Sequence, residues 1–77
     1  MSKKNSNLLT TQASPEEIYF VIKRKVFVYP IYKNGKFYIQ VDNNGKLKTF
    51  EKSVAIKDLN DAIAKTIKHY YKLLKKL

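Results

Sequence analysis

The sequence predicts an α+β fold, in which a three-stranded antiparallel β-meander packs on a long C-terminal helix and a short helix precedes the sheet. Two turn-like segments, Asn34-Gly35 and Asn43-Asn44-Gly45, separate three runs of alternating apolar and polar residues. Residues 58 to 77 repeat apolar side chains at helical spacing. A serine, a proline and two glutamates at residues 14 to 17 are typical of a helix start.

The N-terminal helix is expected from about Pro15 to Lys23, with Ser14 as its N-cap and Glu17 closing a capping box. Residues 18 to 22 are β-branched or aromatic and favour a strand, so a strand remains the alternative there. Residues 1 to 13 are polar and aperiodic and predict a flexible N-terminal arm, with residues 14 to 77 as a single domain.

The three strands are expected at residues 25 to 33, 36 to 42 and 46 to 52. Asn34-Gly35 suits a two-residue type I′ turn, and Asn43-Asn44-Gly45 suits a three-residue loop with a bulge. These turns place Lys33 opposite Lys36 and Asp42 opposite Lys46. Pro30 assigns the first strand to an edge of the sheet. The core face would then consist of Val26, Val28, Tyr32, Phe37, Ile39, Val41 and Leu47.

The opposite, outer face mixes aromatic rings with lysines, as a nucleic-acid groove requires. Cover by the N-terminal helix or by a second copy in a homodimer is the alternative, because an exposed apolar patch is costly. The same register assigns to this face Phe27, Tyr29, Ile31, Tyr38, Gln40, Lys48 and Phe50, with Lys36, Lys46 and Lys52 in phase.

The final helix is expected to begin at Asp58 as its cap, and its apolar side should cover the sheet. That side comprises Leu59, Ile63, Ile67, Tyr70 and Leu74. On the opposite side lies a row of Lys65, Lys68, Lys72 and Lys76, with Lys75 beside it, and no acidic residue follows Asp61. The row could track phosphates, be an ordinary solvated face, or lie on anionic lipid.

Charge is the strongest global feature, since 16 Lys and Arg against 6 Asp and Glu give a formal net charge of +10. This balance favours polyanionic partners. The absence of cysteine and the single histidine, His69, leave no residues for a disulfide, a catalytic triad or a multi-His metal site. We therefore expect no enzyme activity, no cofactor and no metal. No signal peptide or spanning segment is evident, which predicts a soluble cytoplasmic protein without membrane contact.

The segments KNGKFYIQV and DNNGKLKTF, followed by the helix segment DAIAK, resemble the sheet-and-helix DNA-binding domains of the AP2 type and of the arm-binding regions of tyrosine integrases. The resemblance implies that the sheet face opposite the helix enters the major groove, with Tyr29, Tyr38, Gln40, Lys48 and Phe50 on it. The order of elements also resembles a double-stranded RNA-binding domain, although the final helix here starts with acidic residues. A single-strand binder of the PC4-like coactivator type is a further alternative.

Together these observations predict a non-catalytic nucleic-acid-binding protein, with DNA favoured over RNA. Arg24 is the only arginine, so base reading would depend on Gln40, on Asn34, Asn43 or Asn44, or on lysines, and we expect weak sequence specificity. The alternative is a protein-binding adaptor or inhibitor, such as a phage- or plasmid-encoded effector, docking on an acidic protein. The candidate nucleic-acid contacts are Tyr29, Lys36, Tyr38, Gln40, Lys46, Lys48, Phe50, Lys65, Lys68, Lys72 and Lys76.

Overall fold

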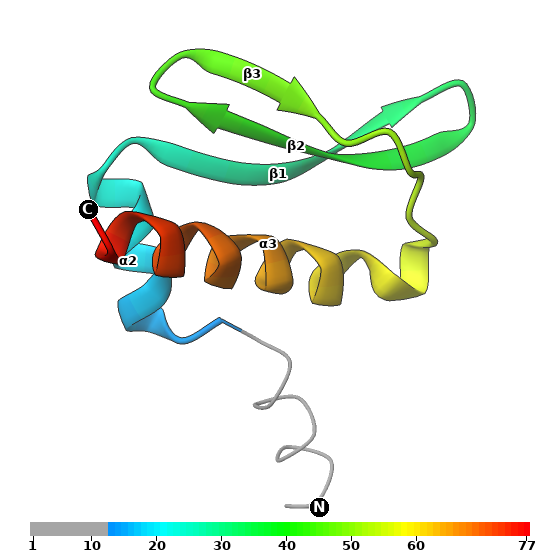
Figure 1. Ribbon diagram of the computed structural model, residues 1–77. Helices are drawn as coiled ribbons and strands as arrows, with labels where there is room; N and C mark the ends of the chain where they lie inside the picture. The colour runs from blue at the N-terminus through cyan, green and yellow to red at the C-terminus, as the bar shows by residue number, and fades with distance from the viewer. Residues whose placement is uncertain (1–12) are drawn as a thin grey trace, which may run out of the picture.

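The computed structural model describes residues 13 to 77, and the predicted arm lies outside them except for Ala13, which packs half-buried against the core. A three-stranded antiparallel sheet of order β1-β2-β3 has both helices on one side (Figure 1). The predicted α+β fold is confirmed. The elements are α2 (Pro15–Lys23), β1 (Val26–Lys33), β2 (Lys36–Asn43), β3 (Lys46–Thr49), the 3-10 turn η1 (Ile56–Asp58) and α3 (Leu59–Lys75).

Helix α2 begins with the capping box that the sequence predicts. The Ser14 Oγ accepts from the Glu17 N–H at 3.1 Å, and the Ser14 N–H donates to Glu17 Oε1 at 2.8 Å. These bonds satisfy two backbone donors that a helix start otherwise leaves free. Local capping therefore outweighs the strand preference of residues 18 to 22, and Val21 from this run is buried in the core.

The first hairpin also forms as predicted. Asn34 and Gly35 both have positive φ, 53° and 78°, as a type I′ turn requires, and Lys33 pairs with Lys36. Strand β1 is an edge of the sheet, so Pro30 can occupy its middle although proline has no N–H to donate.

The second hairpin differs from the prediction by one residue. Asn44 and Gly45 alone form the turn, with φ of 56° and 92°, and Asn43 pairs with Lys46. The Asp42 carboxylate accepts from the Gly45 N–H at 2.8 Å, and the Asn44 N–H donates to the Lys25 carbonyl at 2.9 Å. These two bonds hold a tight type I′ turn, so the three-residue loop with Asp42 opposite Lys46 is wrong.

This one-residue change moves every β3 side chain to the other face of the sheet. Leu47 pairs with Asp42, lies on the outer face and is 63% exposed, whereas the prediction had it in the core. Lys48 pairs with Val41 and so belongs to the helix-facing side, together with Lys46. Phe50 follows in the same phase and packs half-buried against the core.

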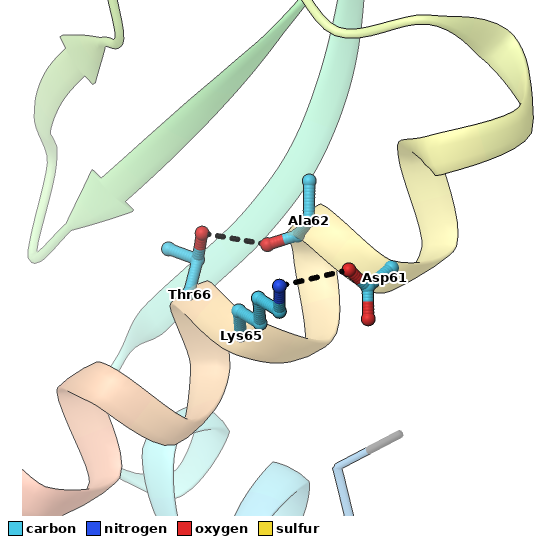
Figure 2. Close-up of polar contacts among 4 residues, drawn as sticks. All are labelled: Asp61, Ala62, Lys65 and Thr66. Carbon is cyan, nitrogen blue, oxygen red and sulfur yellow. Dashed lines mark hydrogen bonds and ion pairs between the residues drawn. The ribbon is translucent and has the colours of Figure 1, made fainter. Parts of the chain in front are cut away.

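The core lies between the sheet and the two helices. Its buried members come from α2, β1, β2 and α3, and Thr66, the buried polar residue among them, donates to the Ala62 carbonyl at 2.8 Å (Figure 2). Tyr32, expected in the core, is 66% exposed near the first turn and instead packs on the Phe37 ring at 4.9 Å. Asp58 occupies the N-cap of α3 without the expected side-chain hydrogen bond. The buried apolar residues are Val21, Val26, Ile39, Val41, Ala64 and Ile67.

The register of β3 can be tested by truncating Val41 and Leu47 separately. Val41 is 1% exposed, so Val41→Ala should reduce the free energy of unfolding by about 2 to 3 kcal/mol through a cavity in the core. Leu47 projects from the outer face, so Leu47→Ala should change it by less than about 0.5 kcal/mol. Urea denaturation measures both, and losses of similar size would return Leu47 to the core.

Candidate nucleic-acid interface

The outer face of the sheet points away from α2 and α3 (Figure 1). Its side chains form cross-strand rows, because each pair in the register places two side chains side by side. Phe27 at one end is 42% exposed, and the rings nearer the middle are half-buried among their neighbours. The rows are Ile31 with Tyr38, then Tyr29 with Gln40 and Thr49, then Phe27 with Asp42 and Leu47.

The central row is joined by hydrogen bonds across all three strands. The Gln40 Nε2 donates to the Tyr29 hydroxyl at 2.8 Å, and the Thr49 hydroxyl donates to Gln40 Oε1 at 2.7 Å. Both bonds are partly shielded from water, which strengthens them and holds the three side chains in one arrangement. The Tyr29 hydroxyl accepts in this network, so its own proton stays free to donate to a ligand.

These bonds limit how the protein could read bases. Reading adenine with glutamine uses the amide N–H and carbonyl together, and both groups of Gln40 already have partners. Asn44 is similarly occupied, since its Nδ2 donates to the Arg24 carbonyl at 3.3 Å and to Asn43 Oδ1 at 2.8 Å. Of the amides expected to read bases, Asn34 alone is free of such a network in the described chain.

Two lysines belong to the outer face, at its first-hairpin end. Lys33 and Lys36 form the pair next to the turn, and the Lys33 Nζ lies 5.4 Å from the centre of the Tyr38 ring. Lys36 was predicted on this face. Lys33 was not proposed as a contact, although it is in the phase of Tyr29 and its pairing with Lys36 could have identified it.

Three predicted contacts lie elsewhere. Lys46, Lys48 and Phe50 are on the helix-facing side of β3 because of its register, and the Lys48 Nζ lies 5.5 Å from the centre of the Phe50 ring. Their expected place beside Tyr38 is therefore wrong. The outer face is less basic than the sequence predicts, since Leu47 and Thr49 lie there in place of Lys46, Lys48 and Phe50.

The lysine row of α3 lies on the far side of the molecule from the outer face. Ile63 and Ile67 point toward the core, and residues of the row are about half a helical turn away from them. Lys65 forms an ion pair with Asp61 at 3.1 Å (Figure 2), whereas Lys72 and Lys76 are exposed and Lys68 is half-buried. The predicted contacts are thus divided among the outer face, the helix-facing side of β3 and the exposed side of α3.

A further cationic group lies where α2 meets the end of α3, and it was not predicted as a site. The Arg24 guanidinium lies 3.6 Å from the centre of the Phe20 ring and donates to the Phe20 carbonyl at 3.3 Å. The Phe20 and Tyr71 rings meet edge-to-face at 4.9 Å, and the Lys75 Nζ donates to the Tyr71 hydroxyl at 3.2 Å. Phe20 and Arg24 are four residues apart in the sequence, and so are Tyr71 and Lys75. Residues four apart are neighbours on a helix, so this spacing is the sequence pattern that predicts the two ring–cation contacts.

Other site types are not evident in the described part of the chain. Over residues 13 to 77, no three His, Cys, Asp or Glu side chains gather where they could bind a metal ion. None of the helices in that range has both the length and the apolar character needed to cross a membrane.

Comparison of the chain with protein-family models, with curated proteins and with solved structures found no significant match. A function can therefore be inferred only from the residues and their arrangement.

The hydrogen-bonded central row can be tested with Tyr29→Phe, which removes the acceptor of the Gln40 amide. The free energy of unfolding should fall by about 1 kcal/mol, because a partly buried donor loses its partner. Tyr32→Phe is the matched control, since Tyr32 is 66% exposed and should change stability by less than about 0.5 kcal/mol. Equal urea midpoints for Tyr29→Phe and the unmodified protein would contradict the network.

Proposed function

We propose that this protein is a non-catalytic nucleic-acid-binding module whose outer sheet face takes a strand or groove of DNA. The observation that carries the proposal is the outer face itself. Aromatic rings lie there on the side of the sheet opposite α2 and α3, the two α-helices of the described residues, in a chain of formal net charge +10. Flat rings stack on bases or sugars, and ammonium groups neutralise phosphates.

Each part of this face has a role in the proposal. Tyr38 and Tyr29 provide the rings for stacking, and the free proton of the Tyr29 hydroxyl can donate to a phosphate oxygen. Lys33 and Lys36 contact phosphates at the first-hairpin end. Gln40 orients Tyr29 instead of reading a base, because its amide is occupied. Binding would therefore depend mainly on the nucleic-acid backbone and be weakly sequence-specific, with DNA favoured over RNA by the resemblance to sheet-and-helix DNA-binding domains.

A protein-binding adaptor or inhibitor is the second candidate, and one feature favours it. A hollow of about 390 Å³ lies beneath the first hairpin, and it is lined by Tyr32, Phe37, Val54 and Ile56 among others. Tyr32 and Ile56 are 66% and 73% exposed, so apolar surface is available there for an anchor side chain of a partner. Lys36 lines the same hollow and suits an acidic partner. Affinity for such a partner would fall less steeply with salt than nucleic-acid binding, because an apolar anchor provides most of it.

A titration of a short DNA duplex at several salt concentrations tests the proposed function. The logarithm of the affinity should fall linearly with the logarithm of salt concentration, and Lys33→Gln with Lys36→Gln should reduce the steepness by about 2, because two phosphate contacts are lost. Tyr38→Ala should weaken binding about tenfold or more through lost stacking and leave the steepness unchanged.

The matched control replaces Lys46 and Lys48 with Gln. It makes the same change in charge on the other side of β3, so its effect on the salt dependence should be clearly smaller. Circular dichroism should show that each variant keeps its fold. No binding of the unmodified protein at low salt would refute the proposal, and an effect of Lys46 and Lys48 larger than that of Lys33 and Lys36 would exclude the outer face as the site.

A further inference from the structure

Two of the cationic surfaces of this protein face opposite ways. The outer face lies on the side of the sheet away from α3 (Figure 1). The lysine row lies on the side of α3 away from the sheet, because Ile63 and Ile67 on the opposite side of the helix pack in the core. A nucleic-acid segment that rests on the outer face would be separated from the row by the sheet, the core and the helix. One short segment cannot contact both surfaces.

The exposed half of α3 is almost free of negative charge. Asp61 neutralises Lys65 in the ion pair at 3.1 Å, and no acidic residue follows in the chain. The acidic residues of α2, Glu16 and Glu17, are in its first turn, whereas its basic end lies against α3 through the contact of Phe20 with Tyr71. The cations that remain without an acidic partner in this region are Lys23, Arg24, Lys68, Lys72, Lys75 and Lys76.

The arrangement of this second group suits a phosphate backbone. The part of the row without an acidic partner, from Lys68 to Lys76, extends over about 12 Å at 1.5 Å per residue. That length corresponds to about three or four phosphates of one DNA strand, at 3.4 Å of DNA helix axis each. Arg24 and Lys75 are held on the two rings of one aromatic pair, at 3.6 and 5.2 Å from the ring centres. Less side-chain freedom is then lost when they bind a ligand.

The geometry points to a second phosphate-binding surface, formed by Lys68, Lys72 and Lys76 of α3 with Arg24 and Lys75 at its end, which binds a separate nucleic-acid segment. One molecule then joins two segments, one on the outer face and one on this row. The inference rests on the proposed function, because it assumes that the outer face holds the first segment. An anionic membrane is the less suitable partner, since the apolar side of α3 is packed against the sheet and unavailable to lipid.

A two-duplex capture assay with the full-length protein tests this inference. One duplex is fixed to beads, an identical fluorescent duplex is in solution, and protein is added below saturation at low salt. The unmodified protein should retain the fluorescent duplex on the beads. Lys72→Glu with Lys76→Glu should reduce that retention about tenfold while the protein itself still binds the bead-bound duplex. Lys52→Glu with Lys57→Glu is the control, since each pair of reversals lowers the net charge by four, from +10 to +6, and both control lysines are exposed in the segment between β3 and α3.

The outcomes separate the inference from the proposed function. Absence of protein on the bead-bound duplex would refute the proposed function. Protein on the beads without retained fluorescent duplex would refute only the second surface. Retention that is equal in the row variant and the control variant would also refute it, because bridging would then come from self-association or from total charge.

Vesicles of phosphatidylserine test the lipid alternative. If the row variant loses binding to these vesicles but still retains the second duplex as the unmodified protein does, the row binds lipid. Melting temperatures of the variants, and the pair Lys72→Gln with Lys76→Gln, control for effects on the helix.

Discussion

Two Asn-Gly turns determine the rest of this structure. In both, the asparagine and the glycine adopt positive φ, which gives the type I′ geometry that matches the twist of an antiparallel pair. Turns of two residues leave no freedom in the pairing, so every side chain of β1, β2 and β3 is assigned to one face. The strand valines and Ile39 face the helices, whereas Tyr29 and Tyr38 lie on the outer face. The core side of the sheet, the outer face and the side on which each strand lysine lies follow from that pairing.

Much of the fold could be predicted, because its signals are local. The capping box at Ser14, the first turn and the apolar side of α3 depend on residues close together in sequence, and each formed as expected. The second turn could not be settled in this way, since Asn43-Asn44-Gly45 suits a three-residue loop as well as a two-residue turn. The three-residue loop, with Asp42 opposite Lys46, assigns Leu47 to the core face. The Asn44 N–H donates to the Lys25 carbonyl, a contact between residues far apart in sequence that spacing alone does not reveal.

The corrected register changes which side chains the candidate site contains, but the site stays on the outer face. Tyr29, Tyr38 and Gln40 share the outer face as predicted, but Lys48 and Phe50 do not join them. The face becomes an aromatic platform with cations at one end, and its central glutamine is a structural member of a hydrogen-bonded row. Alternation along one strand predicts which residues share a face, but only tertiary contacts show which face that is. Neither the bonds of Gln40 nor the pairing of Phe20 with Tyr71 could be read from spacing alone.

We propose that nucleic acid binds the outer face of the sheet. Aromatic rings lie on both faces of the sheet, so the response of the outer-face rings to ligand can be compared with that of a ring on the helix-facing side. Carbon-13 NMR spectra of the ring signals, recorded during titration with a DNA duplex, measure this directly. Tyr29 and Tyr38 should shift with ligand, whereas Phe50, which packs against the core on the opposite side, should not. Shifts of the Phe50 ring with unchanged Tyr29 and Tyr38 signals would contradict the account.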